Sequence, residues 1–329
     1  MKLLLRENSK IFLWTMAPLL LVLLSAVVCR AMDSQEEQVS SISSYAMGVI
    51  HDLNGDTQEA INAYQKSAKF KEANAIHLRL AGDYARLGKM DEAVKELTIL
   101  LKDDPQNVQG RYLLALIYTT RKDYNKASEE YEKILTSLSD ADPQNAEIYG
   151  YLGQLYYSQK QYQKAIAQFE KVLTLNPTDN ADLVYLVGSL YLEVKNKAKA
   201  LEFFDRALKI QPDNDEVLNS LGYLYSEDAN RLDEALGLVE RAVKISPSNG
   251  AYWDSLGWIY FKKGNNTKAL EYLNKANGLL KDPVIYEHLG DVYFQMGDKE
   301  VAKKFWKLSI DLAPNQEQVV KKLKAHDSL

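Results

Sequence analysis

The sequence predicts an all-α protein built from about eight repeated helical hairpins. Three observations carry this prediction. Prolines recur at steps of 31 to 38 residues, small residues recur in register between them, and amphipathic helical patterns fill the intervals. A single hairpin of this size would leave an apolar stripe exposed, so neighbouring hairpins are expected to cover one another.

Seven of the eight prolines mark the repeat, and only Pro18 lies outside it. Proline lacks an amide donor and clashes with the preceding helical turn, so each of the seven is expected to mark a helix end. They are Pro105, Pro143, Pro177, Pro212, Pro247, Pro283 and Pro314.

Small residues fall at two fixed positions between these prolines. The first position, expected where two helices approach closely, holds Gly48, Ala81, Ala115, Gly153, Gly188, Gly222, Gly257 and Gly290. The second holds Ala60, Ala93, Ala127, Ala165, Ala200, Ala235, Ala269 and Ala302. An aromatic residue stands three positions after most of the first set, and large side chains beside small ones are typical of packed helices.

The stretch 250–283 shows one repeat most clearly. Its first half carries Trp253 and Tyr260 on one helical face, and its second half carries Leu273 on another. Gly264 lies between the halves and supplies a turn. The stretch is therefore expected to form two short amphipathic helices joined by a tight turn.

This pattern resembles the tetratricopeptide repeat family. The residues that match the family's motif in one unit are Leu152, Gly153, Tyr156, Ala165, Phe169 and Pro177, and two further units match as well. The resemblance implies a right-handed superhelical solenoid of about eight helix-turn-helix hairpins over residues 41–316. We expect a polar linker over 32–40, an extended loop over 137–145, and a C-terminal capping helix with a tail over 317–329.

Residues 1–31 differ in character from the repeats. Lys2, Arg6 and Lys10 precede an apolar run over 11–29. The run is long enough to span a bilayer, and the whole segment has the layout of an export signal. Three readings stay open: a cleaved signal peptide, a retained hydrophobic anchor helix, or a lipoprotein signal acylated at Cys29. All three place the repeats outside the cytoplasm.

The composition and motifs argue against several classes of function. A formal net charge of −5 and a pI near 5.6 disfavour nucleic-acid binding, which needs a basic face. The single cysteine and four dispersed histidines form no metal-ligand pattern. No catalytic motif is present, so we expect no enzymatic activity, no catalytic residues, no metal and no cofactor.

The resemblance implies instead a binding surface on the inner, concave wall that the first helix of each hairpin builds. The positions that the family uses there correspond to Tyr157, Tyr185, Asn219, Tyr223, Asp254, Trp258, Phe261, Asp291 and Phe294. The large aromatic residues in this set are candidate anchors for a partner. The acidic residues are expected to favour a partner segment with basic side chains.

The sequence thus predicts a non-enzymatic protein–protein interaction scaffold or adaptor that holds a protein or peptide segment in its groove. The export signal, and a likeness of two repeats to those of bacterial envelope proteins, place it on the extracytoplasmic side of a bacterial membrane. Membrane attachment would depend on residues 1–31. The alternative is a permanent structural subunit or assembly factor of an envelope export or polysaccharide-secretion machine.

Overall fold

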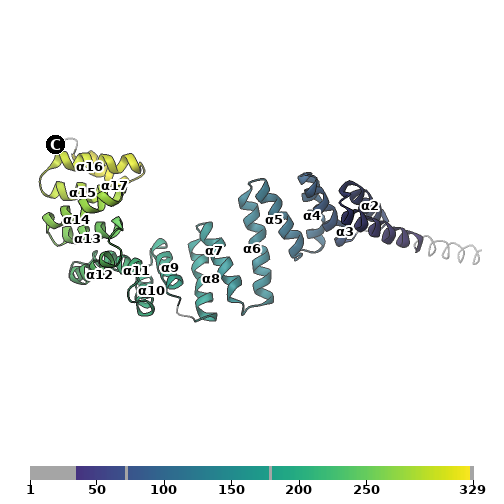
Figure 1. Cartoon of the computed structure of the whole chain (residues 1–329), viewed down its shortest axis with the longest axis horizontal. Helices are drawn as coiled ribbons and strands as arrows, with labels where there is room; N and C mark the ends of the chain where they lie inside the picture. Colours follow the sequence, from purple (N-terminus) through teal and green to yellow (C-terminus); the bar gives the residue numbers. More distant parts are fainter. Residues whose placement is uncertain (1–34, 71–72, 178–179, 327–329) are drawn as a thin grey trace, which may run out of the picture. The chain divides into compact units, whose positions relative to one another are not determined.

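The computed structural model describes residues 35–70, 73–177 and 180–326. Every regular element within these ranges is helical (Figure 1). The chain forms two compact units, residues 1–143 and 144–329. The signal or anchor segment expected over 1–31 lies outside the described residues. None of the described helices has the length and apolar character needed to cross a membrane.

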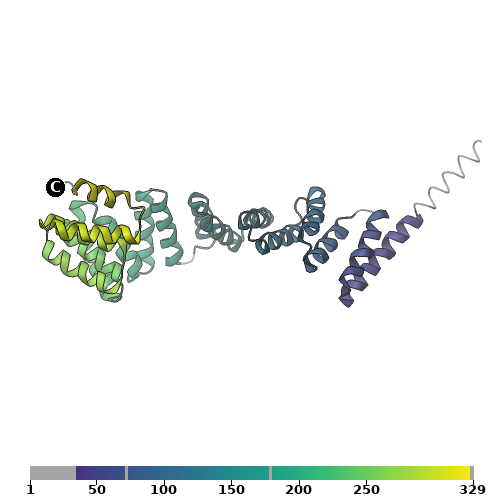
Figure 2. The same cartoon turned by 90° about the horizontal axis from the view of Figure 1, so that it is seen from above.

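The first unit contains three antiparallel hairpins. Residues 35–54 are helical and pair with the next helix, drawn beside them in purple in Figure 2. The remaining helices of this unit are α2 (Thr57–Phe70), α3 (Asn74–Arg86), α4 (Met90–Asp103), α5 (Val108–Thr120) and α6 (Tyr124–Ala141). The side chains between the helices form one apolar cluster that includes Ile61, Tyr64, Leu80 and Leu97.

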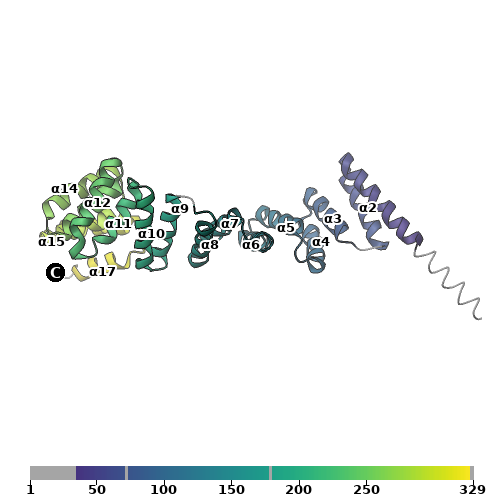
Figure 3. The ribbon, with the colours of Figure 1, turned by 90° about the horizontal axis from the view of Figure 1, so that it is seen from below.

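The second unit contains five hairpins and one further helix. In each hairpin the two helices lie side by side, as Figure 3 shows for α7 and α8. The elements are α7 (Ala146–Ser158), α8 (Tyr162–Leu175), α9 (Ala181–Glu193), α10 (Lys197–Ile210), α11 (Asp215–Tyr225), the 3₁₀ turn η1 (Ala229–Arg231), α12 (Leu232–Ile245), α13 (Gly250–Lys262), α14 (Asn266–Leu279), α15 (Pro283–Gln295), α16 (Lys299–Leu312) and α17 (Glu317–His326).

The recurring glycines sit where the two helices of a hairpin meet. A Cβ atom at Gly153 would lie 2.4 Å from Cε1 of Phe169, and one at Gly290 would lie 2.4 Å from Cδ1 of Trp306. Real Cβ contacts do not come this close, so the aromatic ring of the second helix fills the space that the glycine leaves. The small and large residues that recur in the sequence are thus the residues that pack against one another within each hairpin.

Gly150 and Gly153 share helix α7, yet we expect opposite effects when each is replaced by alanine. Gly153→Ala should lower the free energy of unfolding by about 1–3 kcal/mol, because Phe169 must move. Gly150→Ala should raise it by up to about 1 kcal/mol, because alanine favours helix and a Cβ there meets nothing within 4 Å. Chemical denaturation followed by circular dichroism measures both; equal effects would contradict this packing.

Short turns with an asparagine cap connect successive hairpins. The asparagine side chain accepts a hydrogen bond from an amide of the first turn at Asn107, Asn145, Asn180, Asn214 and Asn249. Such caps stabilise a helix by about 1 kcal/mol each. Pro283 departs from the expectation that each proline marks a helix end, because it occupies the first turn of α15 behind the cap Asp282. Proline suits that position, where no amide donor is needed.

Two other sequence expectations differ from the structure. Residues 35–40, expected to be a polar linker, are helical and continue the first helix of the array. Their glutamines and glutamates favour helix. The segment 137–145, expected to be an extended loop, is helical as far as Ala141 because α6 continues for 18 residues. The inserted residues thus lengthen a helix, and only residues 142–145 connect the hairpins.

The two ends of the described array are covered differently. At the C-terminal end, Val319 and Leu323 of α17 are buried against Ala302 and Trp306. At the other end, the helix over 35–54 leaves a row of apolar side chains exposed, namely Val39, Ile42, Ile50 and Leu53. No described residue covers this row.

Candidate partner-binding face

All nine sequence-predicted site residues belong to the second unit and lie on the first helices of its hairpins: α7, α9, α11, α13 and α15. The structure brings α11, α13 and α15 together, since α13 contacts both of the others. We use the name first-helix face for the group of side chains that these three helices bring together. It comprises Asn219, Tyr223, Asp254, Trp258, Phe261, Glu287, His288 and Asp291.

Tyr157 and Tyr185 stand before this face along the chain and differ in exposure. Tyr157, on α7, is 49% exposed and its ring lies 6.3 Å from that of Tyr162. Tyr185, on α9, is half-buried against Phe204, and its hydroxyl lies 3.1 Å from that of Ser220. Tyr157 is therefore free to contact a partner over half its surface, whereas Tyr185 joins two neighbouring repeats.

A buried aspartate–histidine pair joins α13 to α15. Oδ1 of Asp254 lies 2.9 Å from Nδ1 of His288, and both side chains are almost fully buried. The ring of Trp258 stacks on the imidazole with centroids 4.0 Å apart and lies 5.0 Å from that of Phe261. Sequence reasoning placed Asp254 in the groove as a charge for a partner. The structure instead engages its carboxylate with His288, so this charge serves the repeat interface.

Asp291 and Phe294 hold the C-terminal end together. Trp306 donates a hydrogen bond from Nε1 to Asp291, and Lys322 of α17 places Nζ 2.6 Å from the same carboxylate. Lys322 also reaches Glu287 at 2.7 Å. The ring of Phe294 packs 5.5 Å from that of Trp306. Asp291 and Phe294 thus belong to the contacts that α15 makes with α16 and α17, and neither is an exposed anchor.

Tyr223 is the most exposed side chain at the centre of the first-helix face, at 37%. Burial of its hydroxyl, followed by the nearby carboxylates of Asp254, Glu227 and Glu287, raises the pKa of this tyrosine. The hydroxyl therefore stays protonated at neutral pH and is available as a donor. Next to it, Oδ1 of Asn219 is buried and accepts no hydrogen bond from any described residue.

The first unit contains a second cluster, in which Arg79 and Arg86 lie beside two aspartates. The sequence analysis did not single out either aspartate. Asp52 accepts hydrogen bonds from Tyr64 at 2.8 Å and Arg86 at 3.2 Å. Asp83 is only 1% exposed, and burial, followed by its hydrogen bond to Asp52 and that residue's charge, raises its pKa to about 7. This cluster lines a pocket of about 380 Å³.

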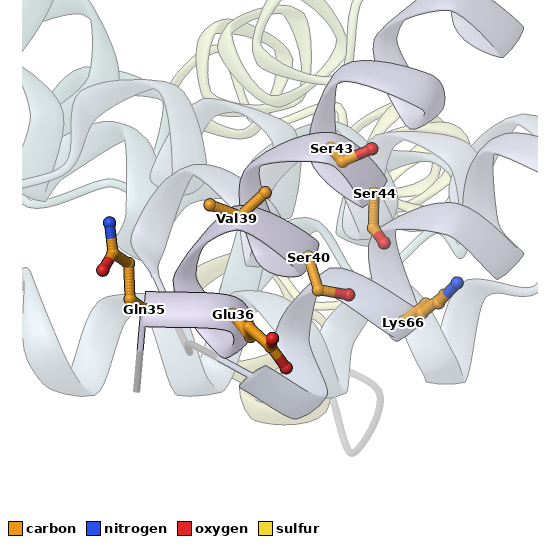
Figure 4. Close-up of a pocket in the computed structure, with 7 residues that line it drawn as sticks. All are labelled: Gln35, Glu36, Val39, Ser40, Ser43, Ser44 and Lys66. Carbon is orange, nitrogen blue, oxygen red and sulfur yellow. The ribbon is translucent and has the colours of Figure 1, made fainter. Parts of the chain in front are cut away.

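A larger pocket of about 540 Å³ lies between the helix over 35–54 and α2 (Figure 4). Most of the side chains that line it are exposed, including Glu36, Val39 and Lys66. Ser44 is buried near it, and the neighbouring Ser41 and Ser67 hydrogen-bond to one another. The pocket is a shallow surface between two helices with no concentration of charge.

Within the described ranges, no three histidine, cysteine, aspartate or glutamate side chains are placed to share a metal ion. Within the first-helix face Asp254 is engaged with His288, while Glu287 and Asp291 are engaged with Lys322 and Trp306. What the face offers to a partner is partly exposed aromatic surface at Tyr223, Trp258 and Phe261. Such surface suits the binding of a protein segment.

Comparison with protein families identifies this architecture. Models described as tetratricopeptide repeat match residues 43–74, 78–146, 146–179, 181–214, 203–237, 226–280 and 284–316. The chain belongs to the tetratricopeptide repeat family. Proteins of this family bind protein or peptide partners, so the fold suggests an interaction scaffold. No curated protein matches the chain in sequence.

Solved structures share the fold. The Cut9–Hcn1 hetero-tetramer of the APC/C aligns at a TM-score of 0.51 and 16% identity, over 82% of this chain and 52% of that chain. TTC0263 of Thermus thermophilus aligns at 0.48 and 21% identity, over 56% and 100% of the two chains. YrrB, described as having an unusual peptide-binding site, aligns at 0.42 and 24% identity, over 57% and 94%.

Proposed function

We propose that the chain is a non-enzymatic scaffold that holds a segment of a partner protein on the first-helix face of its last repeats. The observation that carries this proposal is the row of partly exposed aromatic side chains at Tyr223, Trp258 and Phe261. Tyr223 stands on α11, and Trp258 and Phe261 stand about one turn apart on α13, which packs against α11. The repeat packing holds these two helices rigid.

The aromatic row has the properties of an interface centre. The stack on His288 already holds the Trp258 ring in place, so little side-chain entropy is lost when a partner covers this ring. Phe261 extends the same surface, and the Tyr223 hydroxyl adds a directional donor. Because Asp254 and Asp291 are already paired, recognition depends on aromatic contact more than on charge.

The proposed setting is the extracytoplasmic side of a bacterial membrane. Support for it comes from the sequence alone: a basic start, an apolar run over 11–29, and an acidic segment after it. Localisation of the full chain by protease protection in spheroplasts tests this separately from binding. Cleavage of the repeats from outside the inner membrane is expected, and protection until lysis would contradict the setting.

A double variant, Tyr223→Ala with Phe261→Ala, tests the binding proposal and leaves the Trp258–His288 stack in place. We expect capture of the partner by the full chain to fall at least tenfold, because central aromatic contacts contribute about 2 kcal/mol or more each. The readout is quantitative affinity capture from the source cells, followed by mass spectrometry.

Tyr124→Ala is the matched control, because Tyr124 is an exposed tyrosine on α6, a second helix of the first unit. Circular dichroism must show that all variants keep their helicity. If the double variant and the control retain the same partners in the same amounts, the first-helix face is not the binding site. A partner held at fixed stoichiometry in both would favour the alternative of a permanent structural subunit.

A further inference from the structure

The exposed apolar side chains of the helix over 35–54 need an explanation, because the end of a repeat array normally presents a polar outer face. At the C-terminal end α17 covers the last hairpin. At the other end Val39 and Ile42 are 62% and 63% exposed, and Ile50 and Leu53 are 47% and 82% exposed. Apolar side chains gathered on one exposed face mark an interaction surface.

The spacing of these side chains is symmetrical about Ala46, which is also exposed. The steps from residue 39 to 42, 46, 50 and 53 are three, four, four and three residues, so the pattern is the same in either direction. At 3.6 residues per turn, the five positions lie within about 80° of one another around the helix. We call these five residues the N-terminal row.

The opposite side of the same helix is already occupied. Gly48 is buried where the ring of Tyr64 approaches it, and Ser44 is buried as well. Asp52 accepts hydrogen bonds from Tyr64 and Arg86. The packing of the first hairpin therefore fixes the orientation of the helix, and the N-terminal row faces away from the rest of the first unit.

The charges of this helix favour a protein surface over a lipid surface as the occupant. Residues 35–54 contain neither lysine nor arginine, and they carry the acidic Glu36, Glu37 and Asp52. Helices that lie on a membrane usually combine an apolar face with basic side chains that attract anionic lipids. The row itself contains no charged residue, so two copies of the row can meet without bringing like charges together.

We propose that the N-terminal row binds the same row of a second copy of this chain, in an antiparallel pair of helices related by a two-fold axis. In such a contact each residue meets its symmetry-related position. Ala46 then meets Ala46 of the second copy, Ile42 meets Ile50, and Val39 meets Leu53. The small side chain at position 46 lets the two helices approach closely where they cross.

This inference goes beyond the proposed function, because the N-terminal row belongs to the first unit and shares no residue with the first-helix face. A contact between two single helices is small beside the interfaces of permanent dimers. We therefore expect a reversible association, which covalent crosslinking detects better than the isolation of a stable dimer.

Disulfide crosslinking of the full chain tests the pairing. Each variant carries Cys29→Ser and one new cysteine, at Val39, Ala46 or Leu53. Ala46→Cys is expected to form a disulfide dimer, because this position lies on the two-fold axis. Two copies of position 39 lie about 21 Å apart along an antiparallel pair, beyond the reach of a disulfide. Val39→Cys and Leu53→Cys should each crosslink at least tenfold less alone and should crosslink with each other when mixed.

A charge exchange tests the same register in the Ala46→Cys background. Ile42→Glu and Ile50→Lys should each lower the yield of dimer at least tenfold, because each buries a charge against an isoleucine. The chain that carries both changes should regain dimer, since each glutamate then meets a lysine of the second copy. Both positions are exposed in the single chain, so its fold should tolerate the changes. Leu312→Glu, at an exposed position of α16, is the control.

Three results would overturn the proposal. Equal crosslinking from positions 39, 46 and 53 alone would show association without this register, for example through residues 1–34. Absence of dimer from position 46, with its thiol shielded from maleimide, would show that another segment or protein covers the row. A double variant that dimerises no better than its single parents would exclude the pairing of positions 42 and 50.

Discussion

Replacement of Trp306 by alanine is expected to lower the stability of the C-terminal repeats by about 3–5 kcal/mol, as deletion of a buried tryptophan does. Trp306 is 2% exposed and fills the space beside Gly290. Its loss would leave a cavity under α17 and remove the hydrogen bond to Asp291. Repeat arrays depend on neighbour contacts, so the loss should be concentrated in α15, α16 and α17.

Hydrogen exchange, resolved by helix, is the suitable measurement for Trp306→Ala. Trp306→Phe should lose less, about 1–2 kcal/mol, because it keeps a ring and loses mainly the indole donor. Lys307→Ala, at the next, exposed position, serves as the control. A change below about 1 kcal/mol in Trp306→Ala, small against the usual cost of such a deletion, would show that this side chain does not hold the end of the array.

Replacement of Asp83 by asparagine is expected to stabilise the first unit at pH 8. The pKa of Asp83 rises from 3.8 in the unfolded chain to about 7 in the folded one. The folded state therefore binds more protons between these values, and stability falls as pH rises from about 4 to 7. Each pKa unit corresponds to about 1.4 kcal/mol, so the ionised carboxylate lowers stability by about 2–4 kcal/mol above pH 7.

The measurement is the difference in unfolding free energy between Asp83→Asn and the wild type at pH 5 and pH 8. We expect the variant to gain little at pH 5 and about 1–3 kcal/mol at pH 8, since the amide can donate to Asp52 without carrying charge. Asp103→Asn, on an exposed aspartate of α4, controls for the change in net charge. A variant that is less stable than the wild type at pH 8 would contradict this account.

The sequence predicts the hairpins well because their packing is local and periodic. Gly153 and Phe169 meet within one repeat, so their spacing in the chain determines their contact. The sequence predicts the ends of the helices less accurately. Pro283 begins a helix that its position suggested it would end, because proline fits the first turn of a helix as well as the residue after one.

The candidate site was less predictable because its contacts join different repeats. Asp254 and His288 stand 34 residues apart, and Lys322 reaches Glu287 across 35 residues. Such pairs depend on how one hairpin stacks on the next, which no local pattern encodes. Asp52 stands four residues after Gly48, at a repeat position that the family uses on its inner face. Asp52 could therefore have been predicted as a site residue. Nothing in the sequence separates Asp83 from a solvated aspartate.

Site-specific photo-crosslinking in living cells tests most directly whether the first-helix face holds a partner. The photoreactive residue replaces Tyr223 in one variant of the full chain and Lys244, an exposed residue on the second helix α12, in another. The account predicts a crosslinked partner protein from position 223 and none from position 244. Adducts from position 244 alone, or the same adducts from both, would contradict it.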